Sequence, residues 1–388
     1  MTRYSLIVIN QSQAEPFQRL LEALSEQLGP SLLITGAPYE AKSSCLKIDQ
    51  APSYQRSSIR LRVLSWVDFC LNVLWKVFLI RRPSLLLVTT NPPFLLHLAL
   101  LLNILRGWRF VFLAWDLYPQ HLVSSSLLSA NNPIVKAWHY LNGVALRRAS
   151  LVIAISDGMS DEIITSEQSV LPKIRVIPNF AITDRIRPIS KAENPFAMKY
   201  GLCDKLVVLY SGNIGQTHDL EPVLLSAARL EQFKDLVFLF IGDGLGKERL
   251  VNKASELKLN NLLFLPMQDE DMLPFSLTSG DVAIVSQSTG THNYSLPSKT
   301  YSYMAAGCAL LAIGDRSSDL SSFVTNNSIG ISTLGDPESI FKAIEQLVKD
   351  RGLLSTMQKN SREISTSRYD IEQAKSSWLD ALRTVCSN

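Results

Sequence analysis

Short apolar runs alternate with segments of helical periodicity along the whole chain, and this alternation limits the possible folds more than any other feature. Six runs in the first part are rich in β-branched and large apolar residues and predict strands: SLIVIN, SLLIT, SLLLVTT, RFVFLAWD, LVIAIS and IRVIPN. Between them lie helical patterns such as residues 133–149, where apolar residues recur every three or four positions. Because the strands are apolar on both faces, helices must cover both sides of a parallel sheet.

The alternation stops in residues 181–205 and then begins again. This stretch has two prolines, mixed charges and weak periodicity, which is typical of an irregular connection. A second set of strands is predicted at LVVLYSG, LVFLFIGDG, LLFLP, DVAIVSQ, ALLAIGD and IGISTLG. The predicted fold class is therefore α/β, with two Rossmann-like, doubly wound parallel-sheet domains facing a cleft. A length of 388 residues suits two such domains.

The predicted boundaries are residues 1–182 for the first domain, 183–205 for the connection and 206–369 for the second domain. Residues 370–388 form a last amphipathic helix, with one apolar face made by Ile371, Ala374, Trp378, Leu379 and Leu382. No strand follows this helix, so we expect it to cross back and pack on the first domain. Ligands in such folds bind at the carboxyl ends of strands, so the loops that follow strands should carry the chemistry.

Composition narrows the possible functions. The net charge of +3 is too weak to indicate nucleic-acid binding, but it suits an anionic small ligand or an acidic membrane surface. The five cysteines are scattered and form no CxxC pair, which argues against a disulfide framework or a structural zinc site and fits a reducing cytosol. The N-terminal apolar run is too short for the core of a signal peptide, so a cytoplasmic location is expected.

Residues 61–82 are apolar almost all round, and residues 94–105 form a shorter apolar run. Polar residues interrupt the longer run, whereas a membrane span needs about 20 nearly uninterrupted apolar residues. One interpretation is a pair of buried helices that cover the sheet. The other is peripheral attachment to the inner face of the cytoplasmic membrane, with four residues near the lipid: Trp66, Trp75, Arg81 and Arg82. Both can hold for different faces.

Two glycine-rich loops follow predicted strands of the second domain. In the first, Gly212, Asn213 and Gly215 precede a helix expected to begin near His218 or Asp219. Glycines let the backbone approach a ligand, and free N–H groups at a helix start can bind phosphate. The loop does not fit the pattern GxGxxG, so no dinucleotide fingerprint is present, and an ordinary strand–helix turn is the alternative.

The second loop is FIGDGLGKERL, in which three glycines, Gly242, Gly244 and Gly246, are followed at once by Lys247. A cation at a glycine-lined helix start can pair with a diphosphate. The alternative is a solvated lysine on a surface helix. The presence of two such loops in one domain favours the phosphate interpretation.

The third candidate is SLPSKTYSYMAAG, residues 295–307. Pro297 and Ser298 predict a helix start with Ser298 as the N-cap, and Lys299 falls in the first turn. A lysine there opposes the helix dipole, which makes sense if an anion binds beside it. The alternative is a lysine that extends into solvent. The following Tyr301, Met304 and Ala305 are expected in the core.

In the first domain, polar and aromatic residues follow two predicted strands, at TTNPPF and AWDLYPQH. Asp116, Tyr118 and His121 lie where a substrate hydroxyl could be bound, so a role in proton transfer is one interpretation of Asp116. The other is an N-cap or turn residue. His97 is interpreted as a core or surface residue, and His139, in the middle of a predicted helix, as structural.

These motifs, taken together and in this order, resemble those of family 4 glycosyltransferases, which have the GT-B fold. The resemblance rests on NPP, DLYP, VIPNF, YSGNIG, FIGDGLGKERL and LPSKTYSYMAAG and covers nearly the whole chain. It is greatest to bacterial enzymes that build capsular, colanic-acid-like or other exopolysaccharides. It implies sugar transfer, with retention of configuration, from a nucleoside-diphosphate sugar bound by the second domain. The acceptor on the first domain would be a saccharide, free or linked to polyprenyl diphosphate, and no metal or other cofactor is implied.

The resemblance also implies site residues. The donor site would be formed by Gly212, Asn213, Gly215, Gly242, Gly244, Lys247, Met267, Gln268, Leu296, Pro297, Ser298, Lys299 and Ser302. Within it, Lys247 would neutralise the leaving diphosphate, and Met267 and Gln268 would meet the base. The implied catalytic residues are Lys247 with Asp116 and His121, either of which would assist removal of the acceptor's proton.

Two features depart from the family pattern. Ser302 and Tyr294 occupy the positions of two glutamates that the wider family often carries, so contacts to ribose and sugar must differ or activity is reduced. The first strand leads into NQSQAEPF in place of a glycine pair, and Gln11, Ser12 or Gln13 would then replace backbone amides near the acceptor. Two alternatives follow: a sugar-nucleotide epimerase of the same shape, or a non-catalytic nucleotide-sugar-binding partner of another transferase.

Overall fold

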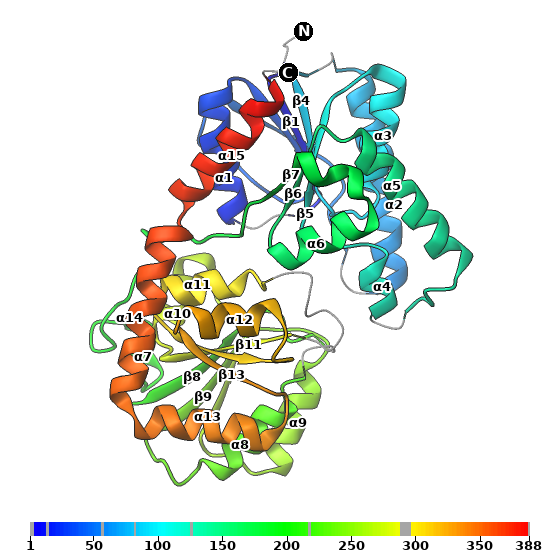
Figure 1. Cartoon of the computed structure of the whole chain (residues 1–388). Helices are drawn as coiled ribbons and strands as arrows, with labels where there is room; N and C mark the ends of the chain where they lie inside the picture. The colour runs from blue at the N-terminus through cyan, green and yellow to red at the C-terminus, as the bar shows by residue number, and fades with distance from the viewer. Residues whose placement is uncertain are drawn as a thin grey trace. The chain divides into compact units, whose positions relative to one another are not determined.

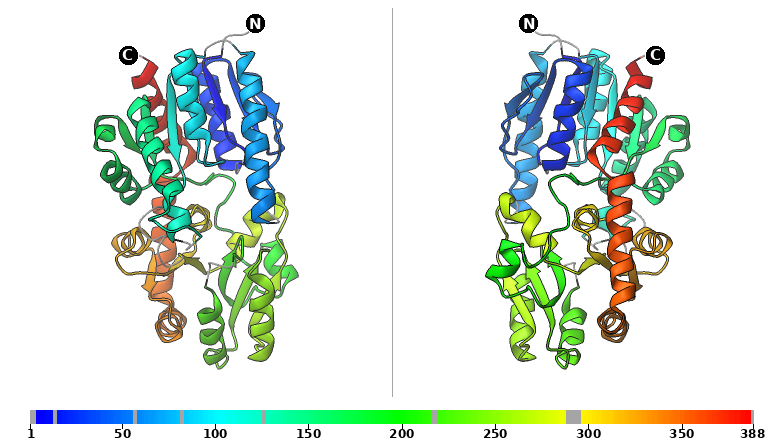
Figure 2. Two further views of the ribbon diagram at one scale, coloured as in Figure 1. Left: turned by 90° about the vertical axis from the view of Figure 1, so that its right-hand side faces the viewer. Right: turned by 90° about the vertical axis from the view of Figure 1, so that its left-hand side faces the viewer.

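Each run predicted to be a strand forms one in the computed structural model, which describes residues 4–12, 15–55, 58–80, 83–124, 127–215, 219–287 and 296–386. The chain divides into two compact units, Met1–Pro178 with Ala374–Asn388, and Asn179–Gln373. In each unit a parallel sheet is covered by helices on both faces (Figures 1 and 2). The predicted α/β class is confirmed.

The sheet of the first unit has seven parallel strands in the order β3-β2-β1-β4-β5-β6-β7. The strands are β1 (Leu6–Ile9), β2 (Ser31–Thr35), β3 (Leu46–Gln50), β4 (Leu85–Val88), β5 (Phe110–Ala114), β6 (Leu151–Ala154) and β7 (Ile174–Val176). The helices are α1 (Glu15–Leu28), α2 (Ile59–Phe78), α3 (Leu95–Arg106), α4 (Gln120–Ser124), α5 (Pro133–Arg148), α6 (Asp157–Ser166) and the 3-10 helix η1 (Gln168–Lys173). In the middle of the sheet, Ile7 of β1 lies opposite Leu32 of β2 and Leu86 of β4.

Strand β3 was not predicted from the sequence. Its residues LKIDQ include a lysine and an aspartate, and the strand pairs only with β2, at the edge of the sheet. An edge strand keeps one side toward solvent, so its sequence lacks the continuous apolar run by which the other strands were found.

Helix α2, which covers most of residues 61–82, has one buried and one exposed face. Phe69, Val73 and Val77 on its inner face are fully buried, whereas Trp75 on its outer face is 68% exposed. Trp66 lies on the inner side, where its ring stacks on Tyr54, so the expectation that Trp66 meets lipid is wrong. Arg81 and Arg82 lie outside the described residues. None of the described helices is long and apolar enough to span a bilayer.

Helix α15 (Ile371–Cys386) belongs to the first unit from Ala374 onward. There the Trp378 ring packs against Phe17 of α1, with centroids 6.3 Å apart, and Arg109 donates a hydrogen bond to the Val385 carbonyl at 2.9 Å. The predicted return of the C-terminal helix to the first domain is confirmed.

The sheet of the second unit has six parallel strands in the order β10-β9-β8-β11-β12-β13. The strands are β8 (Leu206–Ser211), β9 (Leu236–Ile241), β10 (Leu262–Leu265), β11 (Val282–Ser286), β12 (Ala309–Ile313) and β13 (Gly330–Thr333). The helices are α7 (Pro195–Lys199), α8 (Glu221–Arg229), α9 (Lys247–Glu256), η2 (Glu270–Met272), α10 (Leu273–Thr278), α11 (Lys299–Ala305), α12 (Asp319–Asn326), α13 (Pro337–Lys349) and α14 (Arg351–Arg368). Alternate residues of β8 enter two separate cores: Val207 and Leu209 on one face, Val208 and Tyr210 on the other.

Helix α8 begins at Glu221, later than the predicted start near His218 or Asp219. Pro222 occupies the second helical position, where its fixed φ and missing N–H are tolerated, so the first turn forms around it. His218 itself lies outside the described residues.

Gly242, directly after β9, is a position where a side chain cannot be placed. Its φ is +146°, and a Cβ would lie 1.9 Å from the Gly212 carbonyl oxygen, a backbone atom that cannot move aside. We predict that Gly242→Ala lowers the free energy of unfolding by about 3 kcal/mol or more, because both steric overlap and backbone strain are added.

Gly335→Ala is the matched control, since the nearest atom to its Cβ would be 3.9 Å away and φ is ordinary. Chemical denaturation of both variants gives the comparison. Equal stability of the two variants would contradict the close approach of the loops.

Candidate functional site

The loops that follow β8 and β9 are joined by backbone hydrogen bonds beyond the ends of the strands. Ile214 N–H donates to the Asp243 carbonyl and Gly246 N–H donates back to the Ile214 carbonyl, both at 2.9 Å. A Cβ on Gly244 would lie 2.4 Å from the Ile214 carbonyl oxygen. The two predicted glycine loops therefore form one continuous backbone surface, which a side chain at Gly244 would disrupt.

Lys299 lies against this surface. Its ammonium is 3.9 Å from the centroid of the Tyr210 ring, and it would lie 3.4 Å from a Cβ on Gly212. The side chain is half-buried and has no carboxylate partner within the described ranges. Burial lowers the pKa of Lys299 to about 8. The arrangement is a desolvated cation on an aromatic face, next to glycine backbone, which is suited to an anion.

The start of α11 differs in one detail from the prediction. Ser298 is at the N-cap position, but its hydroxyl makes no capping hydrogen bond because its backbone is already helical (φ −57°, ψ −30°). The first turn is instead closed by the Pro297 carbonyl, which accepts from Thr300 N–H at 2.9 Å. Leu296 is buried, Pro297 is half-buried and Ser298 is exposed, so the Ser298 hydroxyl can meet a ligand.

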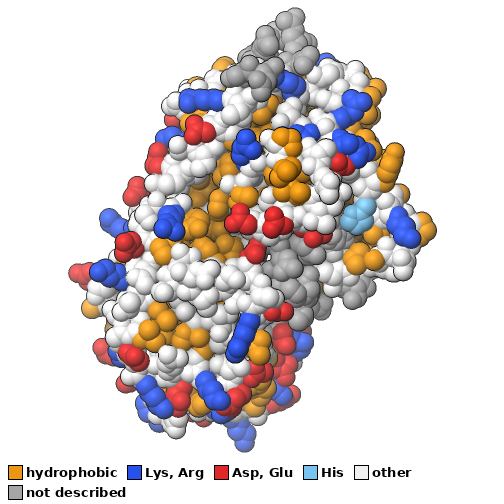
Figure 3. All heavy atoms as spheres, viewed as in Figure 1, with side chains coloured by type: hydrophobic (Ala, Val, Ile, Leu, Met, Phe, Trp, Pro, Cys, Tyr) orange, Lys and Arg blue, Asp and Glu red, His pale blue; other side chains and the backbone are white. Residues whose placement is uncertain are grey.

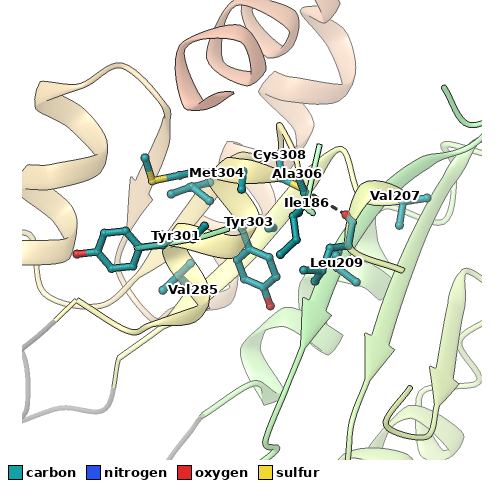
Figure 4. Close-up of a cluster of buried hydrophobic side chains, with 14 of the residues drawn as sticks. Ile186, Val207, Leu209, Val285, Tyr301, Tyr303, Met304, Ala306 and Cys308 are labelled. Carbon is teal, nitrogen blue, oxygen red and sulfur yellow. Dashed lines mark hydrogen bonds between the residues drawn. The ribbon is translucent and has the colours of Figure 1, made fainter. Parts of the chain in front are cut away.

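Two tyrosines that the sequence analysis did not identify as functional fix the first loop. The Tyr303 hydroxyl of α11 accepts from Ser211 N–H at 2.7 Å and donates to the Ser211 carbonyl at 2.9 Å. The Tyr210 hydroxyl donates to the Asn213 carbonyl at 2.8 Å. Tyr303 leaves α11 in a different direction from Tyr301, whose ring lies in the core as expected (Figure 4). The sequence offered one signal for these two residues, because a buried tyrosine usually needs a hydrogen-bond partner for its hydroxyl.

Lys247 already has a partner. Its ammonium is 2.7 Å from Oδ1 of Asp243, and Oδ2 of Asp243 accepts from Met267 N–H at 3.4 Å. The hydrogen bond from Lys247 lowers the pKa of Asp243 below its ordinary value. An anion at this loop must therefore share the Lys247 ammonium with Asp243 or displace the Asp243 carboxylate from it.

The loop after β10 continues the same edge. Met267 is exposed, and the Gln268 amide donates to the Pro266 carbonyl at 2.7 Å, so both lie on the surface near Asp243. Ser302, one turn into α11, is half-buried, and its hydroxyl makes no hydrogen bond with the described part of the chain. Tyr294, the other departure from the family pattern, lies outside the described residues.

In the first unit, Asp116 and His121 lie close together after β5. The Thr90 hydroxyl accepts from Asp116 N–H at 3.2 Å, which ties this loop to the loop after β4. The His121 ring lies 5.7 Å from the Tyr118 ring, centroid to centroid. Although solvent reaches Asp116, the surrounding protein raises the pKa of its carboxyl above the ordinary value, and His121 opposes that rise. A raised pKa makes a carboxylate a better proton acceptor near neutral pH.

A cavity of about 90 Å³ lies beside Asp116 in the same unit. Its polar lining is made by Asp116 itself with Thr90, Tyr118, Gln120, His139, Asn142 and Ser166. Burial lowers the pKa values of His97 and His139, so both are neutral near pH 7, as expected for structural histidines. Within the described residues, no group of three or more His, Cys, Asp or Glu is placed to hold a metal ion.

The suggestion that Gln11 replaces a backbone amide near the acceptor is wrong. Gln11 is fully buried, and its amide nitrogen donates to the Ser65 carbonyl at 2.9 Å and the Pro52 carbonyl at 3.2 Å. It therefore holds α2 to the end of β1. Ser12 is half-buried, and Gln13 lies outside the described residues.

We predict that Tyr303→Phe lowers the free energy of unfolding by about 1–3 kcal/mol, because two backbone groups of Ser211 lose a buried partner. Tyr301→Phe is the matched control. It removes a hydroxyl from the same helix that is buried without a hydrogen-bond partner in the described structure, so we expect no loss of stability. Thermal unfolding measures the stability of both variants. An equal loss of stability in the two would show that Tyr303 does not fix the loop.

Part of the chain is similar in sequence to known glycosyltransferases. Residues 199–364 match the model of the family described as glycosyl transferases group 1. Probable glycosyltransferase WbjE of Pseudomonas aeruginosa is 28% identical over 272 residues, which cover 69% of this chain and 66% of WbjE. Putative colanic acid biosynthesis glycosyl transferase WcaI of Escherichia coli is 30% identical over 208 residues, 53% of this chain and 50% of WcaI. The chain thus matches between half and about two thirds of these curated relatives.

Solved structures show the same fold. HepE of Anabaena, solved with UDP and glucose, has a TM-score of 0.73 at 16% identity, covering 98% of this chain and 99% of HepE. Sucrose-phosphate synthase of Thermosynechococcus elongatus has a TM-score of 0.79 at 15% identity, covering 99% and 100%. At such identities the likeness shows the fold alone, which is the predicted GT-B fold. Residues 199–364, which match the model of glycosyl transferases group 1, contain both glycine loops together with Lys247 and Lys299.

Proposed function

We propose that the protein is a glycosyltransferase that moves a sugar from a nucleoside diphosphate to a saccharide acceptor in polysaccharide biosynthesis. The observation that carries the proposal is the half-buried Lys299 ammonium, which lies on the Tyr210 ring beside Gly212 with no carboxylate partner in the described chain. A diphosphate would supply the missing negative charge. The printed names of WbjE and WcaI, and the UDP and glucose in the HepE structure, support this choice.

The proposed chemistry is stabilisation of a leaving group. When the bond between the anomeric carbon and the diphosphate breaks, negative charge grows on the phosphate oxygens. Lys299 and Lys247 would bind these oxygens together with the Gly244 N–H, since the N–H groups of Ile214 and Gly246 already donate within the loops. Fixed donors and cations of this kind lower the barrier most in a partly desolvated site. Met267 and Gln268 would contact the nucleobase. The proposed outcome is retention of configuration, without a protein nucleophile and without a metal ion.

For the acceptor, we propose a saccharide carried on polyprenyl diphosphate at the inner face of the cytoplasmic membrane. Asp116 is the residue best suited to take up the proton of the attacking hydroxyl, because its carboxyl pKa is raised. His121, next to Asp116, would stabilise the charged form of the Asp116 carboxyl. In the donor site, the Ser302 hydroxyl would give the ribose a single weak hydrogen bond in place of the strong ones that a carboxylate accepts.

The pKa of Lys299 predicts how donor binding depends on pH. Above about pH 8 the lysine loses its proton, so we expect the affinity for a nucleoside diphosphate to fall as the pH rises through this value. Calorimetric titration with UDP, GDP and ADP between pH 6.5 and 9.5 measures the profile. In Lys299→Arg the profile should be flat, because the guanidinium stays charged. In Lys299→Met binding should be about 10–100-fold weaker at every pH.

Lys342→Met is the control for the loss of a lysine, because Lys342 is exposed on α13 of the same unit. It should keep the wild-type profile. If Lys299→Met bound nucleoside diphosphates as tightly as the wild type, and with the same pH profile, the proposed donor site would be wrong.

Turnover separates the proposed activity from its alternatives. With a radiolabelled nucleotide sugar and a membrane extract of lipid-linked saccharides, we expect label to enter the lipid fraction, and Asp116→Asn to lower the rate about 100-fold with donor affinity unchanged. Conversion of the donor sugar without acceptor would indicate the epimerase. Donor binding without any turnover would indicate the non-catalytic partner, the interpretation that Ser302 favours.

A further inference from the structure

Helices α2, α3 and α5 of the first unit carry an outer apolar face. On α2 it is formed by Leu64, Leu71, Trp75 and Phe78, of which Leu64 is 62% and Phe78 is 61% exposed. These four residues fall on one side of the helix over about 21 Å of its length. Exposed Ile104 and Leu105 of α3 continue the face. A contiguous exposed apolar surface of this kind marks an interaction site, whereas scattered single residues do not.

The end of α3 meets the end of α2 at this face. The Arg106 guanidinium lies 5.7 Å from the centroid of the Phe78 ring and donates a hydrogen bond to the Val77 carbonyl at 2.7 Å. Figure 3 shows hydrophobic side chains with Lys and Arg beside them over α3 and α5. The apolar face is therefore one surface with cations at its edge.

The charge of these helices is strongly one-sided. Together α2, α3 and α5 contain seven Lys or Arg and a single acidic residue, Asp68, a net charge of +6. The whole chain has a net charge of +3, so the remainder is negative. Two of the seven cations pair with carboxylates of neighbouring elements, Lys76 with Asp49 and Arg147 with Glu167, so the helices together with these partners keep a net charge of +4. Positive charge is thus concentrated on the helices that expose apolar side chains.

We propose that the outer apolar face docks on a bilayer that contains anionic phospholipids. Trp75, Leu71 and Leu64 would enter the boundary between headgroups and acyl chains, and the basic residues would pair with lipid phosphates. A second copy of the chain is a poorer partner, because a symmetric dimer through this face would bring two positively charged surfaces together. Exposed Asp68 lies between Leu64 and Leu71 and limits insertion to the headgroup level, about 5–10 Å deep.

This inference rests on the proposed lipid-linked acceptor and deepens it. A row of aromatic rings leads from the inner side of α2 to the residues beside Asp116: Trp66 to Phe94 at 6.3 Å, Phe94 to Trp138 at 5.1 Å, and Trp138 to Tyr118 at 6.2 Å between centroids. The helices that expose the apolar face therefore also support the loop that carries Asp116. Docking at this face would hold that loop near the lipid surface from which the acceptor extends.

The test is sedimentation of the full chain with vesicles of phosphatidylcholine containing one third phosphatidylglycerol, without nucleotide. We expect the wild type to sediment at low salt and less so at high salt. Leu71→Ser/Trp75→Ser should weaken binding about tenfold, since two exposed apolar anchors are lost. Met198→Ser/Leu334→Ser removes two exposed apolar residues of the second unit and should sediment like the wild type.

A charge pair provides a second, independent variant. Lys136→Gln/Arg148→Gln on α5 should reduce the salt-dependent part of binding, and Lys342→Gln/Lys349→Gln in the second unit should not. The inference is overturned if the wild type ignores the anionic vesicles, if both test pairs sediment like the wild type, or if sedimentation equilibrium shows a dimer that Leu71→Ser/Trp75→Ser dissociates. UDP binding by the same preparations tests the proposed function separately: UDP binding without vesicle binding overturns only the docking surface.

Discussion

Burial of both faces of each parallel sheet is the constraint on which the rest of the structure depends. Strands such as LIVI of β1 and VAIVS of β11 are buried along their whole length, and the one polar residue of these two, Ser286, lies at the carboxyl end of β11. Polar chemistry is then confined to the ends of the strands. The carboxyl ends of parallel strands lie at one edge, and this is why loops far apart in sequence, after β8, β9 and β10, join into one backbone surface.

The residues at this edge lower the stability of the unit in the absence of a ligand. The charged form of Lys299 is disfavoured by burial, as its lowered pKa shows. Three glycines with positive φ, Gly212, Gly242 and Gly244, lose more backbone entropy on folding than other residues would. The Tyr210 ring and the Tyr303 hydroxyl compensate in part, one by facing the cation and the other by satisfying both backbone groups of Ser211. The site is thus suited to a ligand whose negative charge would face the Lys299 ammonium.

The fold could be predicted because the strands are apolar on both faces, a pattern that needs no knowledge of their partners. The edge strand β3 was missed because it lacks that pattern. In the site, Lys247 is the first residue of α9 and pairs with Asp243 in the loop directly before that helix, so their closeness in sequence is the signal that could have predicted this pair. The contact of Tyr303 with Ser211 could not, because the two residues are 92 positions apart and meet only in the folded unit.

Helix α2 shows why the same sequence pattern supported two interpretations. Its inner face buries Phe69, Val73 and Val77, which accounts for one half of its apolar residues in the usual way. The outer half faces away from the core of its unit, so core packing alone does not explain it. Apolar residues that face water promote association, and an exposed face of this kind is accounted for when another surface covers it. Because the surrounding charge on α2, α3 and α5 is positive, that surface should be negative, and an anionic bilayer meets both requirements with one partner.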